Sequence, residues 1–208
     1  MSQTNNIESR ISIQVALSGY SFKIQDTEGE HSSGWLTPDR IFTTPEFQKR
    51  YDAVKISLLT PKVALIPEQF FNPMELRQML GDVVRLGEND AVEFVRMPER
   101  ASVLLFSNNV GETLSRMISQ TVFTTDGYQA RILPEMYYIL EALDKCSDYN
   151  KIVASYADGY LHLAVAQGKS LQIANTFRAV DFTTAEYFIF NTLKKLQLNP
   201  EISTICFR

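Results

Sequence analysis

The sequence is poor in the residues on which disulfide scaffolds, collagen-like chains and many metal sites are built. It has two cysteines, two histidines, nine glycines and eight prolines in 208 residues. These low counts exclude a disulfide scaffold and a collagen-like chain. With 45% hydrophobic and 21% charged residues, the chain can bury a core and is not intrinsically disordered. Its length suits one large domain or two small ones.

The two cysteines and the absence of long apolar segments bear on the compartment. Cys146 and Cys206 stand far apart in the sequence and form no CxxC motif, which favours a reduced compartment with both thiols as small hydrophobic groups. Residues 1–10 are polar and lack the apolar stretch of a signal peptide. No segment approaches the roughly 20 apolar residues of a transmembrane helix. We therefore expect a soluble, cytoplasmic protein without direct membrane insertion.

Charge and motifs exclude several functional classes. The net charge is -4, and no run of Lys or Arg occurs, so we do not expect binding to nucleic acid. The first expected strand, residues 11–17, carries no carboxylate, whereas an RNase H-like nuclease needs several clustered carboxylates. His31 and His162 alone cannot form a metal cluster, and we interpret His162 as a strand residue that faces solvent or is partly buried. GxSxG, HExxH, Walker A and GxGxxG motifs are all absent.

Hydrophobic periodicity predicts a chain of mixed α/β class. Alternating or β-branched runs indicate strands at residues 11–17, 20–24, a short segment ending near residue 36, 62–66, 91–97, 101–107, 121–125, 152–156, 161–165, 171–177 and 202–207. The strand at 62–66 is of the buried, parallel type, and those at 91–97 and 101–107 form a hairpin. Capping residues and helical spacing predict helices at 43–58, 72–81, 110–119 and 134–145, and from about 183 to 196.

Several of these landmarks recur at a fixed distance along the chain. Gly19 matches Gly159, and the capping pair Thr43 and Glu46 matches Thr183 and Glu186, each 140 residues later. Gly29 matches Gly168 and Pro61 matches Pro200, each 139 residues later. The order and spacing together predict duplicated β-β-β-α-β units, the second copy abbreviated. We expect a first domain at residues 1–148 and a second, incomplete domain at residues 149–208.

A repeated β-β-β-α-β unit is the layout of the actin, sugar-kinase and Hsp70 superfamily. Through residues 11–22 and 156–178, the chain resembles a bacterial family of unknown function with an actin-like (RNase H-like) ATPase fold, distantly similar to cell-division and pilus-assembly actin homologues. The resemblance implies that the short second copy, residues 151–208, lacks the elements that supply the adenosine-binding turn. We expect either a chain that has been cut short or a protein without half of a nucleotide site.

The resemblance also locates two phosphate-binding turns. In ATP-using members, an acid two positions before the turn glycine holds Mg²⁺ through water, while backbone N–H groups bind phosphate. Those positions are Leu17 and Ala157 here, and neither side chain can ligate a metal. The degenerate turns leave these nucleotide-binding candidates: Ser18, Gly19, Ser21, Asp158 and Gly159. The alternative is that Ser21 and Asp158 are ordinary turn residues.

These features favour a non-catalytic binding protein or assembly scaffold that has no catalytic or metal-ligating residues and no cofactor. A protein partner or a homodimer is the expected binding mode. The alternative is an ATP-binding protein, ATPase or phosphotransferase that uses ATP and Mg²⁺ through diverged acids, with Asp26, Asp158 or Asp181 recruited.

Aromatic residues offer one further indication of a partner. Three adjacent aromatic pairs occur, Phe70-Phe71, Tyr137-Tyr138 and Tyr187-Phe188. Because neighbouring residues cannot share one face of a helix or strand, one ring of each pair should point away from its own core. Such rings either pack against another domain or form a partner surface. The expected last strand, residues 202–207, would be an exposed edge that can recruit another strand.

Overall fold

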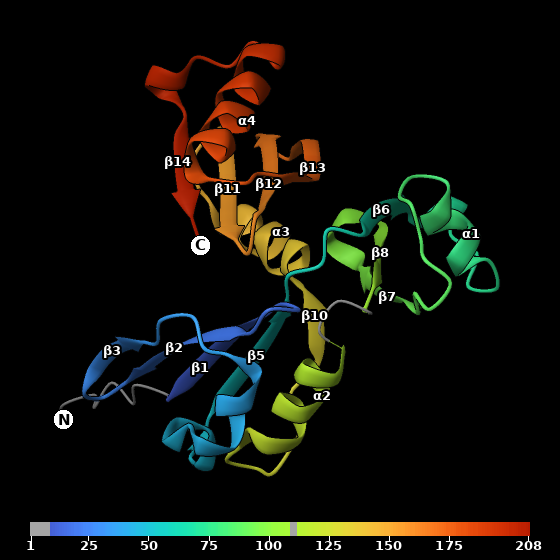
Figure 1. Cartoon of the computed structure of the whole chain (residues 1–208). Coiled ribbons are helices and arrows are strands. Elements are labelled where there is room, and N and C mark those ends of the chain that lie inside the picture. Colours follow the sequence, from blue (N-terminus) through green and yellow to red (C-terminus); the bar gives the residue numbers. More distant parts are fainter. Residues whose placement is uncertain (1–8, 109–111) are drawn as a thin grey trace, which may run out of the picture. The chain divides into compact units, whose positions relative to one another are not determined.

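Two structural units make up the part of the chain that the computed structural model describes, residues 9–108 and 112–208 (Figure 1). The first unit comprises Met1–Leu58 and Val110–Leu133, and the second comprises Leu59–Asn109 and Pro134–Arg208. The expected boundary at residue 148 therefore falls inside the second unit. The chain passes from one unit to the other three times, which a linear comparison of repeats cannot detect.

The first unit is built on a five-stranded sheet in the order β10-β5-β1-β2-β3. The predicted meander is confirmed, because β1 (Arg10–Val15) pairs antiparallel with β2 (Tyr20–Asp26), which pairs antiparallel with β3 (Gly29–Ser32). On its other side β1 pairs with the parallel strand β5 (Ala53–Leu58), and β10 (Ile132–Pro134) lies beyond β5. Two further short strands, β4 (Arg50–Tyr51) and β9 (Phe123–Thr124), form a separate parallel pair.

Alternation along the strands directs one set of side chains into the core of the first unit. Ile11 and Ile13 of β1 and Phe22 of β2 are buried together with Leu114 and Ile118 of α2 (Glu112–Thr121). Period-2 spacing on the strands and i, i+4 spacing on the helix place these groups on facing surfaces. The helix expected at 110–119 is α2, and its first two expected residues lie outside the described residues.

The helix expected at residues 43–58 is wrong. Two short 3-10 helices, Pro38–Thr43 and Pro45–Gln48, precede β4 and β5 instead. Phe47 is buried, as the spacing predicts, but it reaches the core from a 3-10 turn. The segment Ala53–Leu58 contains the β-branched residues Val54 and Ile56 and pairs along its whole length with β1. This pairing outweighs the helical spacing of the apolar residues.

The second unit contains a four-stranded sheet in the order β13-β12-β11-β14. β11 (Asn150–Ala157), β12 (Tyr160–Gln167) and β13 (Ser170–Arg178) form the predicted antiparallel meander, and β14 (Thr204–Phe207) lies parallel to β11. α4 (Phe182–Lys195) packs on the face that carries Ile152 and Leu163. α3 (Glu135–Lys145) contacts the same two central strands, whose other alternate residues, such as Val153 and Ala164, are also buried.

The sheets of the two units correspond in topology. The order β3-β2-β1-β5 matches β13-β12-β11-β14, with two antiparallel pairings followed by one parallel pairing in each. The predicted match of Pro61 with Pro200 is wrong, because Pro61 follows β5 whereas Pro200 precedes β14 in a 3-10 turn, Pro200–Ile202. In residues 9–108 and 112–208, an α-helix stands between the third and fourth strands of the second meander (α4), whereas two 3-10 helices stand at the corresponding place in the first. Duplication of the chain therefore stays a prediction.

Two expected helix caps also differ from the structure. Asp181, and not Thr183, caps α4, because its Oδ1 accepts a hydrogen bond of 2.7 Å from the backbone N–H of Thr184. α1 (Leu76–Gly81) starts after Glu75 rather than at Asn72, whose side chain accepts from the N–H of Met74 in a tight turn. Both Asp and Asn satisfy local N–H groups in turns and caps.

In residues 9–108 and 112–208, no helix is long and apolar enough to cross a membrane.

A smaller antiparallel sheet, in the order β6-β8-β7, completes the second unit. β7 (Val92–Met97) and β8 (Ser102–Ser107) form the predicted hairpin, joined by a 3-10 turn at Pro98–Arg100. β6 (Val63–Pro67), which a further 3-10 turn at Glu68–Phe70 follows, pairs antiparallel with β8. Its expected parallel pairing is wrong, because its neighbour is a strand of the hairpin. Leu80 of α1 packs against this sheet.

The buried carboxylate of Asp90 forms hydrogen bonds to several loops and strands of this smaller sheet. Asp90 is buried, and its Oδ2 accepts from Lys62 Nζ and from the N–H of Gly87, both at 2.5 Å. Its Oδ1 accepts from Ser107 Oγ at 3.0 Å, and its main-chain oxygen accepts from Arg77 Nη1 at 2.6 Å. A buried charge with these partners fixes the segment before β7 against β6 and β8.

Asp90→Ala should destabilise the small sheet by on the order of 3 kcal/mol, because it removes one partner of a buried ion pair. Hydrogen exchange of the β6 and β8 amides is the suitable measurement, since the single tryptophan, Trp35, belongs to the first unit. Asp82→Ala, at an exposed position at the end of α1, is the matched control. Equal protection in both variants would contradict the assignment of Asp90 as the organising group.

Candidate functional site

The first predicted phosphate turn is closed by the backbone of the chain itself. Ala16 N donates to Gly19 O at 2.9 Å, and Tyr20 exchanges two main-chain hydrogen bonds with Leu36, of 2.9 and 2.7 Å. A Cβ on Gly19 would lie 2.1 Å from the carbonyl oxygen of Leu36. This close approach requires glycine whether or not a ligand binds. The side chain of Leu17 is 73% exposed beside the turn.

The second predicted phosphate turn is a two-residue hairpin turn. Asp158 and Gly159 connect the paired residues Ala157 and Tyr160, and both have positive φ, 50° and 76°. Positive φ at both central positions is the mark of a type I′ turn, for which Asp-Gly is a preferred sequence. Gly159 O accepts from the N–H of Ala179 at 2.9 Å. Hairpin geometry therefore accounts for the Asp-Gly dipeptide.

The predicted nucleotide-binding residues are divided between the two units. Ser18, Gly19 and Ser21 belong to the first unit, and Asp158 and Gly159 belong to the second. Ser21 lies on β2 between the buried residues Tyr20 and Phe22, so its side chain leaves the opposite face of the strand. Within the described chain, no three side chains of His, Cys, Asp or Glu come together as potential metal ligands.

The acids named for an ATPase have local structural contacts. Asp26 Oδ1 accepts from the N–H of Glu28 at 2.8 Å in the β2–β3 turn. Asp181 caps α4, and its hydrogen bonds with Thr184 lower the pKa of its carboxyl group. Asp158 lies in the type I′ turn. Each carboxylate therefore has a role in a turn or a helix cap.

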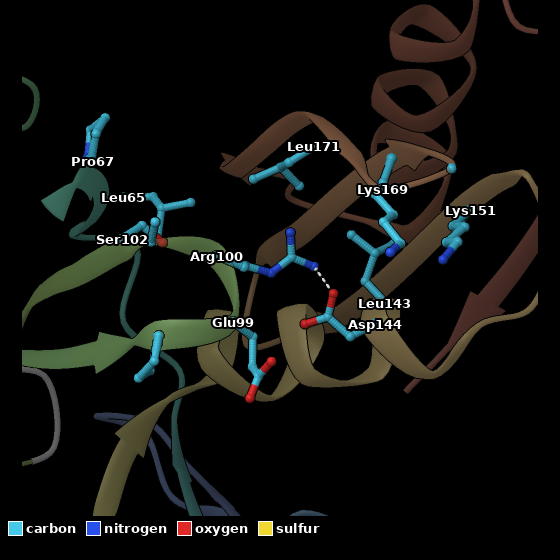
Figure 2. A pocket seen from close by; sticks show the side chains of 14 residues that line it. Leu65, Pro67, Glu99, Arg100, Ser102, Leu143, Asp144, Lys151, Lys169 and Leu171 are labelled. Atoms are coloured by element: carbon cyan, nitrogen blue, oxygen red, sulfur yellow. Dashed lines mark hydrogen bonds and ion pairs between the residues drawn. The ribbon is translucent and has the colours of Figure 1, made fainter.

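A cleft of about 860 Å³ opens within the second unit (Figure 2). One wall comes from β6 and the β7–β8 turn, and the other comes from the end of α3 and the β12–β13 turn. Its apolar lining includes Leu65, Leu143 and Leu171. Its charged lining consists of Glu99, Arg100, Asp144, Lys151 and Lys169. The volume lies in the range of small-molecule sites.

Arg100 is the central polar group of this cleft. Its side chain is 11% exposed, and its Nη2 donates to Asp144 Oδ1 at 2.6 Å and to the main-chain oxygen of Leu140 at 3.4 Å. The Arg100 Nε and the hydroxyl of the neighbouring Ser102 are both buried and have no hydrogen-bond partner among the described residues. Ala101, between them, has the left-handed φ of 45° that ends the 3-10 turn.

Two lysines on the opposite wall complete the positive lining. Lys151 lies near the start of β11, and Lys169 lies in the turn between β12 and β13. In the part of the chain that the structure describes, neither ammonium group forms a hydrogen bond or an ion pair. Figure 2 shows Arg100 and Lys169 entering the same space from turns on its two sides. Their charges are available to an anion in that space.

A second polar cluster lies at the start of α3, around a carboxylate that is fully buried. Glu135, in the first turn of α3, is fully buried and accepts a hydrogen bond from Arg208 Nη1. The Arg208 guanidinium also lies 4.8 Å from the ring centroid of Tyr138, a cation–π contact. Burial raises the pKa of the Tyr138 hydroxyl, and the Arg208 charge partly opposes this effect. The cluster joins α3 to the residue that follows β14.

His162 of β12 lies close enough to Glu135 for the carboxylate charge to act on its imidazole. It is fully buried, which corrects the expectation of a partly buried or solvent-facing residue. Its Nδ1 lies 3.1 Å from Thr176 Oγ1, and its Nε2 has no partner among the described residues. Burial lowers the pKa of the imidazole to about 4, although the charge of Glu135 opposes the shift. The ring is therefore neutral at pH 7.

The two cysteines, distant in sequence, are neighbours in the structure. Cys146 follows α3 directly, and Cys206 lies in β14. Burial raises the pKa of the Cys146 thiol, and a hydrogen bond with the Cys206 thiol raises it further. The raised pKa makes the Cys146 thiol a poor nucleophile at neutral pH.

The adjacent aromatic pairs point as predicted in two cases. Phe71 packs on Phe94 at 4.9 Å between ring centroids, while Phe70 is 67% exposed. Phe188 stacks on Phe177 at 4.8 Å, while its neighbour Tyr187 is 63% exposed. In the third pair Tyr138 is buried and Tyr137 is half-buried.

Sequence reasoning missed the cleft and the cluster at the start of α3. Arg100 and Asp144 are 44 residues apart, and Glu135 and Arg208 are 73 residues apart. No spacing rule connects residues at such separations, and none of the four belongs to a motif. An isolated signal existed only in α3, where Glu135 opens an otherwise apolar helical run.

The strand order and pairing of the two sheets define an actin-like ATPase fold, as the sequence predicted. A Bacteroides thetaiotaomicron protein of actin-like ATPase fold and unknown function is 16% identical and matches with a TM-score of 0.64, over 100% of this chain and 84% of its own. The cytoplasmic domain of EpsL, an inner membrane component of the type II secretion system of Vibrio cholerae, is 9% identical and matches with a TM-score of 0.53, over 96% of this chain and 82% of its own.

A PilM–PilN type IV pilus biogenesis complex also matches, at 12% identity over 93% of this chain and 67% of that one, with a TM-score of 0.49. The chain belongs to the family described as "Protein of unknown function (DUF3822)", whose model matches residues 1–207. Among curated proteins, none matches the chain. At these identities the matches to the Bacteroides thetaiotaomicron protein and to EpsL establish the fold alone.

Gly19→Ala should lower the free energy of unfolding of the first unit by about 2 kcal/mol, because the new Cβ overlaps the Leu36 carbonyl group. Urea unfolding followed by the fluorescence of Trp35, which lies beside this turn, measures the effect. Gly34→Ala is the control, since a Cβ there meets nothing within 4 Å. Unchanged stability in Gly19→Ala would show that packing does not explain this glycine.

The free energy of unfolding should fall between pH 6.5 and about 4, because the unfolded chain binds a proton at His162 that the folded chain excludes. The loss should reach roughly 3 kcal/mol near pH 4, from a pKa difference between 6.5 and about 4. Urea unfolding at a series of pH values should give a flatter curve for His162→Gln. His31→Gln, on the exposed strand β3, should retain the wild-type slope, and identical curves in all three proteins would exclude His162 as the cause.

Proposed function

We propose that this protein works by binding a macromolecular partner through an actin-like fold, as a non-catalytic scaffold, and that it does not turn over ATP. The observation that carries the proposal is the closure of both hairpin turns by the chain itself. At Gly19 the space next to the turn is taken by the Leu36 carbonyl group, and at Asp158 and Gly159 a two-residue turn leaves no loop to wrap a phosphate. Turn geometry and close packing thus explain both glycines without a bound phosphate.

The residues flanking the turns support the same proposal. Leu17 and Ala157 occupy the positions where the resemblance places Mg²⁺-binding acids, and their side chains cannot coordinate a cation. Asp26 and Asp181, two acids that an ATPase could recruit, already accept backbone hydrogen bonds at 2.8 and 2.7 Å. Using either in catalysis would break a turn or a helix cap.

An aromatic surface on the second unit supports a protein partner. We define it by two exposed rings, Phe182 of α4 and Phe207 of β14. The rings of Phe182 and Phe207 are 6.0 Å apart, so the helix and the strand contribute to one patch. Exposed aromatic rings are enriched at protein interfaces. The partner on this surface can also be a second copy of the same chain, which would form a homodimer.

The solved protein EpsL is compatible with this role. EpsL is an inner membrane component of a secretion system, so a chain of this fold can serve inside an assembly. We propose that the present chain likewise has a role in an assembly in the cytoplasm. The free thiols of Cys146 and Cys206 agree with that compartment.

Isothermal calorimetry with ATP and Mg²⁺ tests the proposal, together with an assay for released phosphate. We expect neither Mg²⁺-dependent binding at sub-millimolar concentration nor hydrolysis. Asp158→Asn is the informative variant, because Asn-Gly also suits a type I′ turn and the substitution removes only the charge. Sub-millimolar Mg²⁺-dependent binding with hydrolysis that Asp158→Asn abolishes would overturn the scaffold proposal in favour of an ATPase.

A further inference from the structure

We propose that the cleft in the second unit binds a small organic anion, with an apolar body against its leucines and a carboxylate or phosphate group between Arg100, Lys151 and Lys169. The volume of about 860 Å³ exceeds that of a trapped water cluster and suits a metabolite-sized ligand. Its lining combines apolar side chains with a few charged ones, as small-molecule sites do. The proposal is independent of partner binding, because the cleft shares no residue with the aromatic surface.

The charge balance of the cleft favours an anion. Three cationic side chains face two acidic ones in a chain whose net charge is -4. Of the two acids, Asp144 is already paired with Arg100, and Figure 2 shows Glu99 pointing away from that pair. The two lysines have no counter-ion among the described residues. A ligand anion would supply the counter-ion that they lack.

Two buried polar atoms support the same site independently of the lysines. Ser102 is 5% exposed, and its hydroxyl and the adjacent Arg100 Nε both lack a hydrogen-bond partner in residues 9–108 and 112–208. Both residues line the cleft. A buried donor without a partner is costly in a folded protein, and an acceptor oxygen entering the cleft would relieve that cost.

A ligand anion would compete with Asp144 for the guanidinium group of Arg100. A guanidinium has five N–H donors in a planar fork that matches a carboxylate or phosphate. Asp144 Oδ1 takes one of these donors at 2.6 Å, as a ligand oxygen would. The Asp144 side chain is 48% exposed, so solvent screens the pair and a ligand anion can replace it. Asp144 is therefore an internal competitor of the ligand.

The probes are phenyl phosphate, benzoate, phenol and inorganic phosphate, titrated into the full chain and followed by amide ¹H–¹⁵N shifts at Gly168 and Lys169. Phenyl phosphate or benzoate should bind more tightly than either phenol or inorganic phosphate, because only they combine an apolar body with an anion. The order of the two tells a phosphate ligand from a carboxylate ligand. Equal binding of phenol and both anions, or no shifts at the cleft, would overturn the proposal.

Charge variants give the second arm of the experiment. Lys151→Gln and Lys169→Gln should each weaken binding of the tighter probe about two- to fivefold, whereas Asp144→Asn should strengthen it by removing the internal competitor. Lys194→Gln, on the exposed end of α4 outside the cleft, is the matched control and should change nothing. A purely structural role for the Arg100–Asp144 pair predicts weaker binding or none in Asp144→Asn, and that result, or an equal effect of Lys194→Gln, overturns the proposal.

Discussion

A carboxylate buried at the start of α3 has to be neutralised, and much of the second unit is arranged around that requirement. Glu135 has no exposed surface, and Arg208 supplies the compensating charge. Breaking such a buried pair from one side typically costs about 3–5 kcal/mol. Because Arg208 directly follows β14, and its N–H donates to the main-chain oxygen of Ala154 in β11, the ion pair also holds the edge strand on the sheet.

The other end of the same helix carries a second arginine–carboxylate pair with a different character. Near the C-terminus of α3 the helix dipole disfavours the negative charge of Asp144, and Arg100 offsets it. The Asp144 side chain is 48% exposed, so solvent screens this pair and it contributes little to stability. The ion pair of Glu135 thus fixes the start of α3, whereas at its other end a ligand can replace Asp144 as the partner of Arg100. That contrast is why a binding role fits the exposed pair and a structural role fits the buried one.

How far the sequence predicts the structure depends on whether the signal is local. Alternating residues in β1, β2 and β11 to β13 and the apolar spacing of α3 were sufficient, because each element buries one face by itself. The segment ending at Leu58 was not predicted, since Phe47, Tyr51 and Val54 fit a helical spacing but its partner β1 lies some 40 residues away. The cleft has the same limitation, because Arg100 meets Asp144 only through tertiary packing.

The two turn glycines illustrate why a residue pattern alone cannot separate a phosphate site from a plain hairpin. Glycine is compatible with a phosphate site and with a plain hairpin, so the atoms around it have to explain why glycine is needed. Where a Cβ would project from Gly19 stands the carbonyl oxygen of Leu36, which already accepts a hydrogen bond from the N–H of Tyr20. At Gly159 the nearest atom to an added Cβ is again a carbonyl oxygen, that of Ala179, at 3.8 Å. Close packing against the Leu36 carbonyl group therefore explains Gly19, and the positive φ of a type I′ turn explains Gly159, so neither glycine is by itself evidence of a phosphate site.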